Sequence, residues 1–286
     1  MLNPNMCIMS VDLEDWFQVE NLRTACPINS WDSLEVRLNH GVDRLLELFG
    51  DRRIQATFYT VGYIAAKCPD IIRRIVTKGQ ELALHGYYHQ LLGSMTSDEF
   101  RTDIRRCREV VENISGYKVN GFRAPACSIT DWALDILSEE GFRYDSSYIA
   151  SNLNSRFGKV SGQNSNNHKN IPWKIREALW ELPMPSLNIA GRGIPWGGGG
   201  YFRLIPYPIF RKGIIHILND RGYYHFFIHP WEFDDNQPRI RQIPWLNRFR
   251  HYVNLSETTN KMECILNDFE FVSTQEAIRR LESKIQ

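Results

Sequence analysis

The sequence predicts an α/β fold in which a parallel sheet, open or closed into a barrel, is flanked by helices. Short apolar runs alternate with amphipathic stretches along the 286 residues, at the spacing of repeated strand–helix units. Polar side chains follow directly after several of the predicted strands, which is where (β/α) barrels carry their active sites. Because no shift in composition divides the chain, we expect one domain over residues 1–286.

The predicted strands are short and rich in β-branched or aromatic residues. They cover residues 7–11, 56–61, 81–84, 120–123, 142–144, 179–184, 223–228 and 269–272. Most of them are separated by stretches of helical periodicity. This alternation favours parallel over antiparallel pairing.

Helices are predicted where apolar residues recur every three or four positions. They cover residues 34–49, 69–78, 97–114 and 130–140, part of 205–220, 257–267 and 274–283. Pro69 and Gly79 delimit the second helix, and Ser97 is the candidate N-cap of the third. Residues 151–170 are rich in Asn, Ser and Gly, which predicts an exposed loop.

The composition excludes several classes of function. Lys and Arg number 34 against 33 Asp and Glu, so there is no basic excess for binding nucleic acid. No apolar run approaches the roughly 18 residues that span a bilayer, and residues 1–6 lack the basic and apolar regions of a signal peptide. The six scattered cysteines contain no CxxC pair, which indicates reduced thiols. We therefore expect a cytoplasmic protein without stable membrane insertion.

A pair of histidines follows the strand predicted at residues 81–84. His85 and His89 are four positions apart, and on a helical turn both rings would lie on one side and reach one ion. This pattern also arises by chance. The alternative is two partly exposed histidines on a loop.

Three acids within four residues follow the first predicted strand. Asp12, Glu14 and Asp15 would be costly to bury unless they were paired or bound to a metal. Trp16 and Phe17 come next, so the acids lie beside apolar surface, which suits a metal ligand and a base of tuned pKa. The alternative is a set of acids that face the dipole of a helix N-terminus.

Three further strand ends carry polar residues. Arg123 could orient a carboxylate through a bidentate pair, or form an ordinary salt bridge. His229 ends an apolar run, where it could act as a general acid or fill the core, and His225 would face the same side. Asp145 could hold such a histidine or cap a turn.

Four glycines at 197–200 lie between Trp196 and Tyr201. They show neither of the phosphate-binding patterns GxGxxG and GK[ST] after a strand. A flexible loop here could admit a sugar ring, on which Trp196 or Tyr201 would stack. A plain hairpin turn is the alternative.

Six segments, in order along the chain, carry a family resemblance: SVDLEDWF at 10–17, ATFY at 56–59, LHGYYH at 84–89, GFRAP at 121–125, GGGYFR at 198–203 and HPWE at 229–232. They resemble the NodB-type polysaccharide deacetylases, carbohydrate esterase family four. The resemblance spans about residues 10–232 and is closest to the branch found with exopolysaccharide and exosortase gene clusters. It implies a single NodB-type domain with a distorted (β/α) barrel and a C-terminal extension from about residue 233.

The resemblance also implies a reaction, the removal of the N-acetyl group of a sugar in a polysaccharide or its precursor. Asp12 would be the base, Arg123 would orient it, His229 would be the general acid, and Asp145 would support His229. The residues expected to contact the sugar polymer are Pro125, Trp196, Tyr201 and Trp231.

The resemblance further implies a divalent metal, usually zinc, held by His85 and His89. Better-known members have two adjacent aspartates, the base and then the ligand, whereas here Leu13 follows the base. The carboxylate ligand is therefore Glu14 or Asp15. Strand alternation favours Glu14, which would face the same side as the base.

Two other functions fit the same residues. One is a deformylase or deacetylase of a lipid-linked sugar or a peptidoglycan precursor. The other is a non-catalytic carbohydrate-binding homologue, although such a protein would need no acid–base pair.

Overall fold

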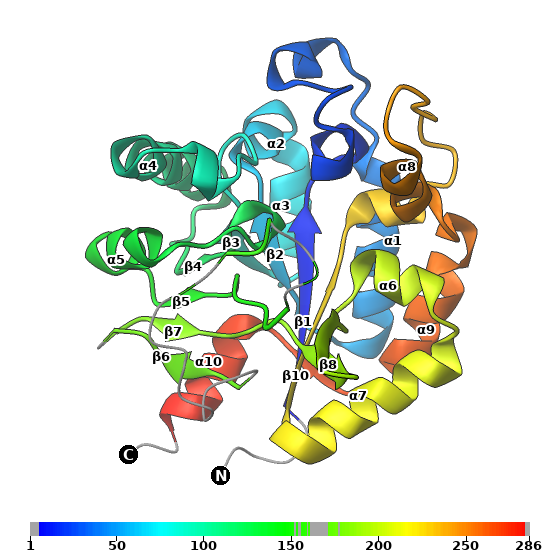
Figure 1. The fold of residues 1–286 in the computed structure, drawn as a ribbon. Helices are drawn as coiled ribbons and strands as arrows, with labels where there is room; N and C mark the ends of the chain where they lie inside the picture. The colour runs from blue at the N-terminus through cyan, green and yellow to red at the C-terminus, as the bar shows by residue number, and fades with distance from the viewer. Residues whose placement is uncertain are drawn as a thin grey trace.

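The computed structural model describes residues 6–151, 153, 156–158, 160, 171–176 and 178–283, and it confirms the predicted α/β fold. A curled, mainly parallel sheet surrounds the centre of the molecule, and helices cover its outer face (Figure 1). The strand order is β10-β1-β2-β3-β4-β5-β7-β6, with β11 also paired to β1. Only β6 runs antiparallel to its neighbour. No strand pairing joins β10 to β7 or β6 in the described chain, so the barrel is open.

All eight predicted strands are present, several with shifted ends. The strands of the main sheet are β1 (Met6–Leu13), β2 (Thr57–Thr60), β3 (Glu81–Leu84), β4 (Gly121–Phe122), β5 (Tyr144–Asp145), β6 (Trp173–Lys174), β7 (Trp180–Glu181), β10 (Tyr223–Ile228) and β11 (Phe271–Val272). A separate antiparallel hairpin of β8 (Ser186–Ile189) and β9 (Arg192–Pro195) was not predicted. Its turn residues Ala190 and Gly191 have positive φ, the geometry of tight hairpin turns.

All seven predicted helices are present. The helices are α1 (Leu38–Arg52), α2 (Gly62–Lys67), α3 (Pro69–Thr77), α4 (Ser97–Ser115), α5 (Asp131–Glu139), α6 (Gly199–Leu204), α7 (Tyr207–Arg221), α8 (Trp245–Tyr252), α9 (Thr258–Asp268) and α10 (Thr274–Glu282). The predicted start of α1 at residue 34 is wrong. Leu34 has extended backbone after the 3-10 turn Ile28–Ser33, and the helix begins at Leu38. Ser97 is not the N-cap of α4. Thr96 takes that place in a capping box with Glu99.

The glycines at 197–200 form neither an open loop nor a hairpin turn. They bring the chain onto β10, where Gly198 pairs with Phe227, and α6 begins at Gly199. Gly198 has φ +147°, and a Cβ there would lie 1.8 Å from the Phe227 carbonyl oxygen. The contact therefore requires glycine. The loop predicted at 151–170 lies largely outside the described residues.

Strand β1 is buried on both faces, which explains its continuous apolar run. Its outward side chains pack into the core beneath the helices: Cys7, Met9, Val11 and Leu13. Its inward side chains become polar toward the carboxyl end: Met6, Ile8, Ser10 and Asp12. One strand thus supplies apolar core at its start and a polar site at its end.

Helix α10 packs against the barrel interior at the amino ends of the strands, where Ala277 and Ile278 meet Tyr59 and Tyr223 in one apolar cluster. This packing leaves the opposite, carboxyl end of the barrel open for the site. None of the described helices combines the length and the apolar character needed to cross a bilayer.

Gly41→Ala tests the packing of α1 beneath the site. A Cβ at Gly41 would lie 2.0 Å from the Pro230 carbonyl oxygen, whereas nothing lies within 4 Å of a Cβ at Gly50 on the same helix. We expect Gly41→Ala to lower the free energy of unfolding by about 1–3 kcal/mol through overpacking. Gly50→Ala should leave it unchanged or raise it by up to about 1 kcal/mol through helix propensity. Urea denaturation measures both, and equal effects would contradict this packing.

Candidate active site

Arg123 lies at the centre of the barrel with its guanidinium fully buried. Its Nη1 donates to Asp12 Oδ1 at 2.5 Å and to Ser10 Oγ at 3.0 Å. Its Nε donates to the Ser146 carbonyl oxygen at 2.9 Å, and Nη2 lies 3.1 Å from His225 Nε2. Arg123 therefore pairs with a carboxylate, that of Asp12, but through one hydrogen bond and not through the predicted bidentate pair.

Asp12 has opposing influences on its pKa. Burial alone would raise the pKa, but the charges of Arg123 and His229 and the hydrogen bond from Arg123 outweigh it and hold the pKa below its usual value. Asp12 is therefore ionised at neutral pH. Its carboxylate lines the pocket and can accept a proton there.

His85 has a fixed tautomer. Its Nδ1 lies 2.8 Å from the carbonyl oxygen of Arg123, which can only accept, so Nδ1 carries the proton. Burial lowers the pKa of His85 to about 4, against the opposing charge of Asp12. The ring is therefore neutral, and the lone pair of Nε2 is left for a metal ion.

His89 is placed by a turn of left-handed backbone. Gly86 and His89 have φ of 71° and 50°, and His89 is a non-glycine residue in a conformation that L residues rarely adopt. The Asp103 carboxylate accepts from Tyr87 N at 2.8 Å, and Arg23 donates to the His89 carbonyl oxygen at 2.5 Å. These contacts fix the turn between the two histidines.

Glu14, His85 and His89 are the three residues that could hold a metal. One potential ligand atom from each lies within 4.8 Å of the others, and all three side chains are buried. Glu14 Oε2 has no hydrogen-bond partner although it lies 2.9 Å from His89 Nε2. A buried carboxylate oxygen without a donor, beside two imidazoles, fits a cation. The adjacent imidazoles of His89 and His229 lower the pKa of Glu14 in spite of its burial.

Asp15, the other candidate ligand, points away from this cluster. Its Oδ1 accepts from Trp16 N at 2.8 Å and its Oδ2 from Arg37 N at 2.7 Å. It caps the 3-10 turn Trp16–Gln18 and joins it to the segment before α1. The structure thus favours Glu14 as the ligand, because Asp15 is occupied by backbone N–H groups.

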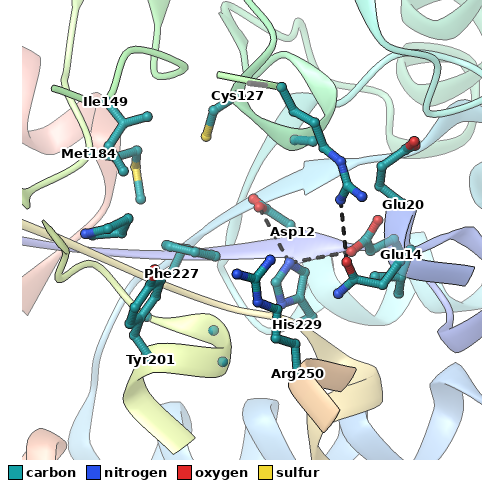
Figure 2. A pocket seen from close by; sticks show the side chains of 18 of the residues that line it. Asp12, Glu14, Glu20, Cys127, Ile149, Met184, Tyr201, Phe227, His229 and Arg250 are labelled. Atoms are coloured by element: carbon teal, nitrogen blue, oxygen red, sulfur yellow. Dashed lines mark hydrogen bonds and ion pairs between the residues drawn. The ribbon is translucent and has the colours of Figure 1, made fainter. Parts of the chain in front are cut away.

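His229 lines the same pocket as His85 and His89, and its ring lies between acids. Its Nδ1 is 2.7 Å from Glu232 Oε1. Its Nε2 is 3.3 Å from Glu14 Oε1 and 3.8 Å from Asp12 Oδ2 (Figure 2). Burial alone would lower the pKa of His229, but these carboxylates outweigh it and raise the pKa to about 9. The ring is therefore protonated at neutral pH, with Nε2–H directed into the site.

The expected support of His229 by Asp145 is wrong. The Asp145 carboxylate accepts from Ser147 N at 3.1 Å and from Ser147 Oγ at 2.7 Å, and it shares a hydrogen bond with the Glu181 carboxyl group. Glu232 supports His229 instead. A buried ion pair with Arg203, 2.5 Å between Nε and Oε2, in turn holds Glu232.

Trp231 is stacked between two imidazoles. Its ring centroid is 5.2 Å from that of His229 and 4.4 Å from that of His251, and its Nε1 donates to Glu14 Oε1 at 3.4 Å. Trp231 reaches the pocket wall, but its buried ring mainly positions other site residues.

A cavity of about 470 Å³ opens over these residues. Of the four predicted substrate contacts, Tyr201 and Trp231 line it. Trp196 does not. Its ring stacks on Phe210 with centroids 5.3 Å apart, and its Nε1 donates to the Phe210 carbonyl oxygen. Pro125 is buried behind the wall that Ala126 and Cys127 form.

Sequence reasoning left Glu232 and Arg203 without roles. Both lie within segments that carry the family resemblance, so the segments contained the signal but gave no indication of the pairing. Arg203 also donates to the carbonyl oxygens of Arg250, His251 and Val253, at 2.9, 2.9 and 2.6 Å. It therefore ties the chain after residue 233, the predicted C-terminal extension, to the general-acid candidate. Whether that segment is an extension added to the domain stays a prediction.

Two family models match adjacent parts of the chain. Residues 30–144 match the polysaccharide deacetylase family, and residues 146–279 match a domain of unknown function, DUF3473. The first region holds His85, His89 and Arg123. The second holds His229 and Glu232.

Curated relatives match part of the chain. It is 24% identical over 144 residues to a peptidoglycan deacetylase of Helicobacter pylori, which is 50% of this chain and 48% of that protein. It is 29% identical over 99 residues to a peptidoglycan-N-acetylglucosamine deacetylase of Bacillus cereus, which is 35% of this chain and 36% of that protein. The chain thus spans about half or less of the length of these relatives.

Solved structures share the fold over nearly the whole chain. One from Mycobacterium smegmatis, described as a polysaccharide deacetylase, has a TM-score of 0.65 at 20% identity, covering 99% of this chain and 92% of that one. A CE4 family pseudoenzyme from Bacillus anthracis has a TM-score of 0.53 at 12% identity, covering 97% and 66%. The fold alone therefore does not determine activity, and the site residues must carry that argument.

Replacing each of the two acids separately tests which one is the ligand. We expect Glu14→Ala to abolish retention of a divalent metal, because the cluster loses its only carboxylate. Asp15→Ala should keep the metal but lower the free energy of unfolding by about 1 kcal/mol, the usual loss for an N-cap. Elemental analysis of dialysed protein measures the first effect and urea denaturation the second. Metal loss in the Asp15 variant alone would reverse the assignment.

Proposed function

We propose that this chain, which carries a polysaccharide deacetylase domain over residues 30–144, hydrolyses the N-acetyl group of an N-acetylated sugar in a polysaccharide or its precursor. One observation carries the proposal. An ionised acid, a cluster of metal-ligand type and a protonated histidine line the same pocket. A binding module would need none of this acid–base machinery, which argues against the non-catalytic alternative.

Glu14, His85 and His89 would hold a divalent metal, and zinc is the metal we propose because two imidazoles and one carboxylate are a ligand set of catalytic zinc sites. When bound there, it polarises the acetamide carbonyl and acidifies a water molecule. The tautomer that the Arg123 carbonyl oxygen imposes on His85 prepares that side chain for this role.

Asp12 removes the proton from the attacking water. Arg123 keeps Asp12 ionised and directs one oxygen away from the pocket, so Oδ2 faces the site. On the other side His229 donates its Nε2 proton to the amide nitrogen as the carbon–nitrogen bond breaks. Glu232 accepts from Nδ1–H and stabilises the imidazolium until the transfer. The products are acetate and a free amino sugar.

The curated relatives named above act, by their names, on peptidoglycan. The segments at 10–17 and 198–203 support an exopolysaccharide as the polymer, because they resemble the exopolysaccharide-associated branch. A lipid-linked precursor is the alternative substrate. The apolar side chains of Leu204, Leu246 and Phe249 at the wall of the pocket favour it.

Activity on N-acetylglucosamine oligomers tests the proposed reaction. We expect zinc-loaded protein to release acetate, and Asp12→Asn or His229→Ala to lower kcat by about 10²–10⁴, the usual contribution of a general base or acid. Both variants should keep their metal, which separates their effect from loss of a ligand. His216→Ala, at an exposed position on α7, is the matched control and should retain full activity. Undiminished acetate release from the Asp12 and His229 variants would refute the mechanism.

Glu232→Gln tests whether Glu232 positions His229. The amide can present an N–H group to Nδ1 and so favour the wrong tautomer, and we expect kcat to fall by about 10² while KM and zinc content stay unchanged. Asp145→Asn is the comparison, because Asp145 does not touch His229. It should change kcat less than tenfold. If Asp145→Asn is the more damaging change, the assignment to Glu232 is wrong.

A further inference from the structure

Helix α8 exposes an apolar face to solvent. Trp245, Leu246 and Phe249 are 72%, 41% and 46% exposed. Their positions i, i+1 and i+4 place them on one side of the helix. Eight large apolar side chains are exposed in the described chain, and these three are the only ones among them that share one helix. Leu204, which is also exposed, lines the same pocket wall as Leu246 and Phe249.

Arginines adjoin the apolar face. Residues 236–256 contain four arginines and no acid, in a chain whose formal net charge is only +1. Arg239, Arg241 and Arg248 line one shallow hollow together with Trp245 and Phe249. No carboxylate of the described chain forms an ion pair with any of these three arginines. No carboxylate within the described chain therefore neutralises these three charges, which are available to an external anionic partner.

This surface adjoins the mouth of the active-site pocket. Leu246, Phe249 and Arg250 line the pocket. Helix α8 lies at the end of the barrel toward which β1 points (Figure 1). The helix is also firmly held, since Arg203 binds the carbonyl oxygens of Arg250 and His251. Its apolar face therefore points outward in a fixed orientation.

We propose that Trp245, Leu246, Phe249, Arg241, Arg248 and Arg250, the α8 surface, dock this protein onto an anionic lipid bilayer. Aromatic and aliphatic side chains enter the headgroup region of a bilayer, and arginines bind its phosphates. Charge complementarity selects this partner. A second copy of the same face would bring arginines against arginines, and an anionic polysaccharide would leave the aliphatic side chains in water. Docking places the pocket mouth at the membrane, where sugars on lipid carriers are located.

Vesicle co-sedimentation with the full chain tests the proposal. We expect binding to vesicles of phosphatidylcholine and phosphatidylglycerol and at least tenfold weaker binding to phosphatidylcholine alone. High salt should weaken the binding, because it screens the arginines. Trp245→Ser and the double variant Arg241→Gln/Arg248→Gln should each weaken binding at least tenfold. Ile209→Ser removes another exposed apolar side chain, from α7, and should bind like the unaltered protein.

Several results would overturn the proposal: no binding to anionic vesicles, equal loss in Ile209→Ser, or binding that the Trp245 and arginine variants retain. Self-association through α8 in sedimentation velocity, or binding of an anionic polysaccharide in place of vesicles, would do the same. The proposal is independent of the deacetylase assignment. Trp245→Ser should release acetate from soluble oligomers at the unaltered rate, so failure of docking and failure of catalysis are distinguishable.

Discussion

The ion pair between Arg123 and Asp12 lies inside the barrel, where an unpaired charge would cost several kcal/mol. The guanidinium also binds Ser10, Ser146 and His225, so groups from β1, from β10 and from the end of β5 converge on one cation. The carbonyl oxygen of the same arginine sets the tautomer of His85. One residue thereby fixes the charge of the candidate base and the tautomer of a candidate metal ligand. The polar interior of the barrel depends on this single buried group.

Much of the fold could be predicted because its strands are buried on both faces and therefore appear as short apolar runs. The parts that were not predicted have other physical origins. The β8–β9 hairpin turns at Ala190 and Gly191, which lack the Asn-Gly signature of such turns. Helix α8 presents its apolar face to solvent, so its pattern does not mark a core-facing helix.

The site residues at strand ends were predictable because parallel strands bring their carboxyl ends together. Their partners were not predictable, since side-chain pairing depends on distances that spacing does not encode. Glu232 reaches His229 from within one tight turn, whereas Asp145 faces Ser147 and Glu181. Trp196 is buried by a packing detail. The Trp196 ring lies directly over Gly213, where a Cβ would come within 2.2 Å of Trp196 Nε1, so only glycine leaves room for the ring.

The boundary between the two matched regions falls at residue 145, and it separates Arg123 from part of its hydrogen-bond partners. Arg123 belongs to one side and Ser146, whose hydroxyl accepts from Arg123 Nη2, to the other, and Asp12 precedes both. Substitutions on the two sides therefore cannot accumulate independently during evolution. Residues 12, 123 and 146 should covary as a set. If the two matched regions are aligned separately, as two families, covariation between residues 123 and 146 cannot be detected.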